Sequence, residues 1–216
     1  MILVLGTLAF VFAVLLLNEY LWKKKILKGE GSRKFIHMLI GTYGAAWPFF
    51  MSWEQIKFVA FLAVGFIIFM RLSGIFHSVY SVRRKSWGDL VAPGTIGILA
   101  ILEPSKLVFA AAVLHIALAD GLAAVIGTRY GKGNTYRVLW NKKSVVGTLT
   151  FVIMSFNILV WLYVRGEVGF TPITLPALLV IPFATAYIEN ISPWGTDNLF
   201  VPLTVVALLG SLQVVI

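Results

Sequence analysis

Long apolar stretches separated by short polar or basic segments are the dominant pattern along this chain. One helix needs about 20 consecutive apolar residues to cross a bilayer core, and eight stretches approach that length. They cover residues 1–21, 35–52, 56–72, 88–102, 107–126, 145–164, 172–188 and 199–216. The pattern predicts an all-α integral membrane protein, a single polytopic domain over 1–216 with about eight transmembrane helices. Pro93 and Pro202 interrupt the fourth and eighth stretches, so either could be a re-entrant or broken helix.

The composition is typical of a membrane protein and excludes several kinds of functional site. Apolar residues make up 59% of the chain and charged residues only 12%, whereas a soluble domain is nearer half apolar and a quarter charged. The absence of cysteine excludes disulfides, thiolate metal sites and cysteine nucleophiles. Residues 1–17 are apolar from the start and no basic region precedes them, so we expect this segment to remain as a membrane helix.

The charges indicate an orientation. The chain has 18 Lys and Arg against 9 Asp and Glu, a formal net charge of +9. With the amino terminus outside, 15 of the 18 cations lie in or beside three cytoplasmic loops, and the fourth cytoplasmic loop has none. Such segregation follows the positive-inside rule and leaves no need for a nucleic-acid partner. We therefore expect the cytoplasmic membrane as the location, with cytoplasmic loops at 22–34, 73–87, 127–144 and 189–198.

Asp120 is the acid that the pattern places deepest in an apolar segment. It lies seven residues, about 10 Å at roughly 1.5 Å per residue, from the inner helix end at Gly127. An acid at that depth is costly and is by default a metal ligand, a proton relay or the buried partner of a cation. The plainer alternative is a structural ion pair with an arginine of an inner loop.

The loop after Asp120 combines glycines with cations. Gly127, Gly131 and Gly133 would let backbone N–H groups approach a ligand closely. Arginine, lysine and hydroxyl groups suit the phosphates of a nucleotide, and a nearby carboxylate could hold its Mg²⁺. The alternative is that these cations serve topology alone. The candidate phosphate ligands here are Arg129, Lys132, Lys142, Lys143 and Ser144.

Two further segments face the same side. Arg33, Lys34 and His37 open the second stretch, where the histidine could be a general base, a phosphate donor or an interfacial polar tip. Residues 189–198 contain acids but no lysine or arginine, which topology does not require. We interpret this segment as a second source of carboxylate or amide ligands facing the basic loop; helix capping by Asp197 or Asn198 is the alternative. The P-loop and protein-kinase motifs are absent.

Four motifs in order resemble the CTP-dependent lipid-alcohol kinases, a family that includes dolichol kinase, phytol kinase and the CTP-using diacylglycerol kinase. The similarity spans about residues 33–202. The motifs are Arg33-Lys34-x-x-His37, Asp120-x-x-Ala123-x-x-x-Gly127-x-x-x-Gly131-Lys132, Lys143-Ser144-x-x-Gly147-Thr148 and Gly195-x-Asp197-Asn198-x-x-x-Pro202.

The middle two motifs are also similar to CDP-diacylglycerol and CDP-archaeol synthases. Those enzymes usually carry Asp-Arg near the carboxyl terminus, where this chain has Asp197-Asn198, and the difference favours the kinases. Val146 stands where both groups often have glutamate, so the role of that glutamate does not transfer to this chain.

The resemblance implies phosphoryl transfer from CTP to the hydroxyl of a membrane isoprenoid alcohol of the polyprenol, dolichol, phytol or geranylgeraniol type. A CTP:lipid-phosphate cytidylyltransferase is the alternative. A transporter is disfavoured because the interior acids and histidines, His115 apart, gather toward the inner face. CTP, Mg²⁺, the lipid alcohol and the bilayer are the expected partners, and a homo-oligomer is left open. The implied catalytic residues are Asp120, Asp197 and His37; the metal ligands are Asp120, Asp197 and Asn198; the phosphate ligands are Arg33, Lys34, Arg129, Lys132, Lys142, Lys143 and Ser144.

Overall fold

The computed structural model describes residues 1–73, 87–166 and 174–214, and within them eight helical segments fall on the eight predicted stretches. A π-helical turn at His115–Ala119 joins α6 to α7 in one continuous helix. The predicted loop 73–87 lies almost wholly outside the described residues. The helices are α1 Ile2–Lys23, α2 Glu30–Ala45, α3 Trp53–Ser73, α5 Gly88–Leu102, α6 Lys106–Leu114, α7 Asp120–Tyr130, α8 Val145–Val164, α9 Thr174–Ile191 and α10 Asp197–Val214.

Four of these segments are long and apolar enough to cross a membrane: α1, α3, the continuous α6–α7 helix and α8. Large side chains of α3 lie on its outer surface, with Phe58, Phe61 and Phe69 more than half exposed. In water such a surface would be an aggregation hazard, whereas hydrocarbon solvates it. The protein is therefore an integral membrane protein. The other four helices have 15 to 18 residues, so full spans there, and the amino terminus outside, stay predictions.

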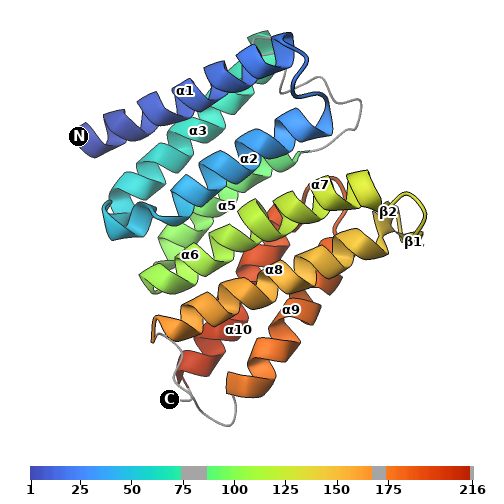
Figure 1. Ribbon diagram of the computed structural model, residues 1–216. Coiled ribbons are helices and arrows are strands. Elements are labelled where there is room, and N and C mark those ends of the chain that lie inside the picture. The colour runs from blue at the N-terminus through green and yellow to red at the C-terminus, as the bar shows by residue number, and fades with distance from the viewer. Residues whose placement is uncertain (74–86, 167–173, 215–216) are drawn as a thin grey trace.

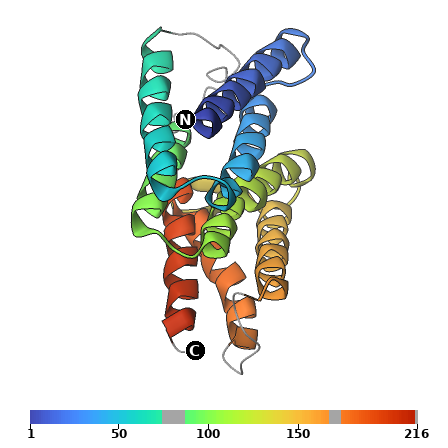
Figure 2. The same cartoon turned by 90° about the vertical axis from the view of Figure 1, so that its left-hand side faces the viewer.

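The α6–α7 helix forms the centre of the bundle (Figures 1 and 2). Helices α1, α2 and α3 lie to one side of it and α8 and α9 to the other. In the most apolar 18-residue segment of this helix, 67% of the residues are buried. The corresponding segments of α1, α3 and α8 are 28%, 22% and 33% buried. Of these four helices in the described part of the chain, the one that carries Asp120 is thus the most shielded from the surroundings.

Small residues and a few hydrogen bonds hold the centre together. Ala110, Ala111 and Ala112 are buried, and a Cβ at Gly41 would lie only 2.6 Å from the Cβ of Ala117. Such close backbone approach is how membrane helices associate, because lipid offers no hydrophobic driving force between them. The buried His115 bonds Ser155 of α8 through Nε2 at 2.8 Å.

A β-hairpin stands in the basic loop, where the sequence predicted only helices and connections. Strands β1 Thr135–Val138 and β2 Asn141–Ser144 pair antiparallel. Its conformation depends on distant contacts, since Asn141 Nδ2 donates to the carbonyls of Asn190 and Ser192 at 3.0 and 2.9 Å. The all-α prediction therefore needs this addition, and the hairpin docks the basic loop onto the 189–198 segment.

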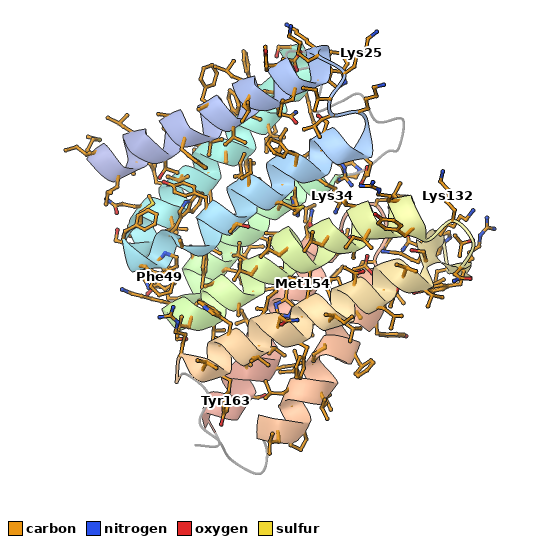
Figure 3. The ribbon with its side chains drawn as sticks, in the orientation of Figure 1. Lys25, Lys34, Phe49, Lys132, Met154 and Tyr163 are labelled. Atoms are coloured by element: carbon orange, nitrogen blue, oxygen red, sulfur yellow. The ribbon has the colours of Figure 1, made fainter. Side chains whose placement is uncertain are left out.

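Charged residues separate along the bundle axis, as predicted. Lys25 and Lys132 lie toward one end of the bundle, and Phe49 and Tyr163 toward the other (Figure 3). At the second end Lys57 is neutralised by Glu54 and Glu103, with Nζ to oxygen distances of 2.8 and 3.0 Å. The end of the bundle that contains Lys132 is thus the cationic one.

Candidate active site

A cavity of about 580 Å³ opens at the cationic end of the bundle. Its walls come from the first half of α2, one face of α7 along its whole length, strand β2, the first turn of α8 and the segment from the end of α9 to the start of α10. It therefore brings together residues from all four sequence motifs. The predicted residues that line it are Arg33, Lys34, His37, Asp120, Lys132, Lys142, Lys143, Ser144, Asp197 and Asn198.

Asp120 stands directly after the π-helical turn, the kind of helix irregularity that often marks a functional site. Its Oδ2 lies 2.5 Å from Lys34 Nζ, and both residues are buried. His37 Nε2 is 4.0 Å from the same oxygen and 2.9 Å from the carbonyl oxygen of Ile116. The ion pair expected as an alternative thus exists, with a lysine of α2 as partner instead of a loop arginine.

Three carboxylates meet in the cavity: Asp120, Glu189 and Asp197 each offer an oxygen within 4.8 Å of the others. Glu189 also forms an ion pair with Lys143. The sequence did not assign Glu189 to the site. Its signal was the cation-free segment 189–198, but which of the acids there turns inward depends on how α9 ends.

This cluster fits a hard divalent cation. Mg²⁺ prefers oxygen ligands, and one or two carboxylates with substrate phosphates commonly hold it. The buried Oδ1 of Asn198 has no hydrogen-bond partner within the described residues, while its Nδ2 donates to the carbonyl of Gly88 at 2.8 Å. The three carboxylates, together with the Asn198 amide oxygen, would therefore suit Mg²⁺.

The cationic wall surrounds these acids. Arg33 forms an ion pair with Glu30; burial opposes its charge, but the pair and the charges of Asp120 and Asp197 raise the pKa of Arg33 above its usual value. Lys132 and Lys142 line the cavity and are exposed. A polyphosphate could bind across these groups with its charge neutralised from several sides.

Arg129 does not join the predicted phosphate ligands. Its guanidinium lies 5.3 Å from the ring centre of Tyr130, and it is not among the residues that line the cavity. The reason is helical geometry, because the residues of α7 that line the cavity recur three or four positions apart, at Asp120, Ala123, Ala124, Gly127 and Thr128.

Two of the glycines have a packing role that the sequence did not indicate. A Cβ at Gly131 would lie 2.3 Å from Ser144 Oγ, and one at Gly127 would lie 2.8 Å from the same atom. Ser144 caps α8, since its Oγ accepts from the N–H of Gly147 at 3.1 Å. The glycines therefore let α7 and α8 meet around this cap. The first turn of α8 then faces the cavity, where the positive end of the helix dipole favours an anion.

Comparison with known proteins agrees with the motifs. Phytol kinase of Synechocystis sp. is 35% identical over 196 residues, which cover 88% of this chain and 83% of the relative. The chain belongs to the phytol kinase family. Phytol kinase 1, chloroplastic, of Arabidopsis thaliana is 26% identical over 217 residues, covering 90% of this chain and 70% of that protein. No family model and no solved structure matches. The resemblance of this phytol kinase family member to the lipid-alcohol kinases is thus confirmed.

Proposed function

We propose that this protein transfers the γ-phosphoryl group of CTP to the hydroxyl of a membrane isoprenoid alcohol. One observation carries the proposal: in the described part of the chain, a carboxylate cluster and five cations line one cavity at the end of a membrane bundle. The two relatives named as phytol kinases support an alcohol acceptor. CTP as the donor rests on the four motifs, and the cytoplasmic membrane as the location rests on the charge pattern.

In the proposed reaction the alcohol oxygen attacks the γ-phosphorus in line. A bond forms between that oxygen and phosphorus, the bond from phosphorus to the β–γ bridging oxygen breaks, and CDP leaves. Catalysis of such a transfer is mostly positioning and neutralisation of charge. Lys132, Lys142 and the first turn of α8 would hold the nucleotide phosphates, while Arg33 and Lys34 would close the cavity from α2.

Asp120, Glu189 and the amide oxygen of Asn198 would hold Mg²⁺, which would supply positive charge against the negative charge of the nucleotide phosphates. Asp197 is the remaining carboxylate of the cluster. Within the described residues it forms no ion pair, unlike Asp120 and Glu189. We therefore assign Asp197 as the acceptor of the hydroxyl proton as the alcohol attacks.

The deciding experiment incubates purified protein in detergent with Mg²⁺, CTP and a panel of lipid alcohols and lipid phosphates. CTP labelled in the γ-phosphate and CTP labelled in the cytosine are used in parallel. The proposal expects γ-label in an isoprenoid monophosphate, release of CDP and no product after chelation of Mg²⁺. Cytosine label in the lipid with release of pyrophosphate would establish the cytidylyltransferase instead. Competition by unlabelled ATP, GTP and UTP measures the preference for CTP.

A matched pair of variants tests the cavity. Lys142→Ala removes an exposed cation of β2 that lines the cavity, whereas Arg129→Ala removes an exposed cation in the last turn of α7 that does not. A hydrogen bond to a charged group contributes about 1.5–3 kcal/mol, so we expect the KM for CTP to rise at least about tenfold in Lys142→Ala. Arg129→Ala should behave as wild type. Equal effects in the two variants would contradict the placement of the nucleotide.

A further inference from the structure

A second cavity of about 440 Å³ lies among α1, α2, α3 and α5 and ends against the π-helical turn. Its described walls are almost entirely apolar and combine small side chains, such as Ala63 of α3 and Ala92 of α5, with bulky ones, such as Phe12 of α1 and Phe66 of α3. Among the residues that the structure describes, the charged or titratable ones that line it are Arg33, His37 and Asp89. Asp89 forms an ion pair with Arg71, with 2.5 Å between Asp89 Oδ1 and Arg71 Nη2.

This cavity adjoins the active-site cavity. Arg33 and His37 line both, so one turn of α2 forms the boundary between the apolar and the polar space. Gly88 of the apolar wall also accepts the hydrogen bond from Asn198 Nδ2, which belongs to the polar wall. The two cavities are therefore fixed relative to each other by α2 and by the contact between α5 and α10.

The apolar cavity is elongated along the helices. It follows α3 from Val59 to Met70, about 16 Å at roughly 1.5 Å per residue. That is about half of a hydrocarbon core of roughly 30 Å. Trp47 lines it too, 14 residues beyond Arg33 on the chain and past the far end of α2. The shape suits a single extended hydrocarbon chain whose polar end lies at His37.

We propose that this cavity binds the isoprenoid tail of the acceptor alcohol and presents the hydroxyl to the carboxylate cluster past His37. This inference rests on the proposed function and adds the site that reads the lipid. A tail that moves from lipid into the cavity gains no hydrophobic energy, because both surroundings are apolar. The cavity therefore selects its tail by shape, and chain length is the property it would discriminate.

Filling the cavity tests this proposal. Ala63→Phe and Ala92→Phe each place a ring in the cavity, from α3 and from its neighbour α5. Gly65→Phe is the matched control, since Gly65 lies two positions along α3, is exposed and has nothing within 4 Å of an added Cβ. Each protein is assayed with CTP and with isoprenoid alcohols of ten and twenty carbons.

We expect both cavity variants to lose at least about tenfold in kcat/KM for the twenty-carbon alcohol, since even one methylene in a pocket changes specificity about 10–200-fold. The ten-carbon alcohol should be phosphorylated within about twofold of wild type, because the short tail leaves room for the ring. Gly65→Phe should match wild type on both. Loss independent of chain length in both variants, or no loss in either, overturns the proposal.

A second measurement separates this proposal from the proposed function. A twenty-carbon alcohol with a photoactivatable diazirine at the tail end should label α3 and α5 peptides without any nucleotide. Ala63→Phe should reduce that labelling, and Gly65→Phe should not. If wild type is labelled there but forms no phosphorylated lipid, the proposed function fails and the tail site stands. If wild type phosphorylates the alcohol but labels elsewhere, the tail site fails alone.

Discussion

The buried pair between Lys34 and Asp120 allows the structural and the catalytic role of this aspartate to be separated. Asp120→Asn removes the carboxylate charge and leaves the Lys34 ammonium buried at a helix interface. Lys34→Met in the same chain then removes the stranded charge and keeps a similar volume. We expect the single Asp120→Asn variant to be destabilised and inactive, and the double variant to regain stability but not activity.

The magnitude follows from the burial of the pair. Removing one partner of a buried ion pair costs about 3–5 kcal/mol. The side chains of Lys34 and Asp120 are only 5% and 9% exposed, so this ion pair is buried. Glu189 and Asp197 lie close enough to Asp120 to offset part of the stranded charge, so we take the lower limit of about 3 kcal/mol. At roughly 2–4 °C per kcal/mol for a chain of this size, the expected loss in Tm is about 6–12 °C.

The assay is thermal unfolding in detergent, followed by tryptophan fluorescence, with CTP-dependent lipid phosphorylation measured on the same preparations. Replacing a whole buried pair by apolar groups is often neutral, so the double variant should recover most of the lost Tm. A Tm for Asp120→Asn within about 2 °C of wild type would refute the reasoning about the pair. Activity in the double variant would refute the metal role and leave Asp120 as a structural partner of Lys34.

Three further predictions concern a proton, a buried hydrogen bond and the orientation. Asp197→Asn keeps an amide oxygen but accepts no proton, so kcat should fall about 100-fold or more; recovery at raised Mg²⁺ would make Asp197 a metal ligand instead. Ser155→Ala leaves His115 Nε2 unbonded and should cost about 1–3 kcal/mol by thermal unfolding in detergent; an unchanged Tm would contradict this. Because the chain lacks cysteine, Lys132→Cys should be labelled only after sealed cells are opened, and Phe49→Cys from outside; the reverse pattern would invert the topology.

The periodic spacing of apolar stretches predicted the helices well, because each stretch must satisfy its own backbone hydrogen bonds in hydrocarbon. The prediction was weaker where local pattern competes with distant contacts. The hairpin of β1 and β2 is the clearest case, since Asn141 bonds the backbone of residues 190 and 192, far along the chain. No local signal in the basic loop specifies those partners.

The same division holds in the active site. Asp120 was recognisable because an acid is conspicuous in an apolar helix. The sequence did not show where α7 ends or which of its faces points into the cavity. Arg129 and Lys132 were therefore both predicted as phosphate ligands, although of these two only Lys132 lines the cavity. The packing role of Gly131 against Ser144 was likewise invisible until the two helices were placed side by side.

The sequence by itself determined the membrane class, the helical stretches, the separation of charge between the two ends and the residues of the four motifs, because these follow from local composition and the solvent properties of a bilayer. Tertiary structure decided which acids converge, that Lys34 is the partner of Asp120, that Glu189 joins the carboxylate cluster, and that an apolar cavity meets the polar one at His37. These features depend on side chains from helices distant in the chain, and their distances are set only when the helices pack.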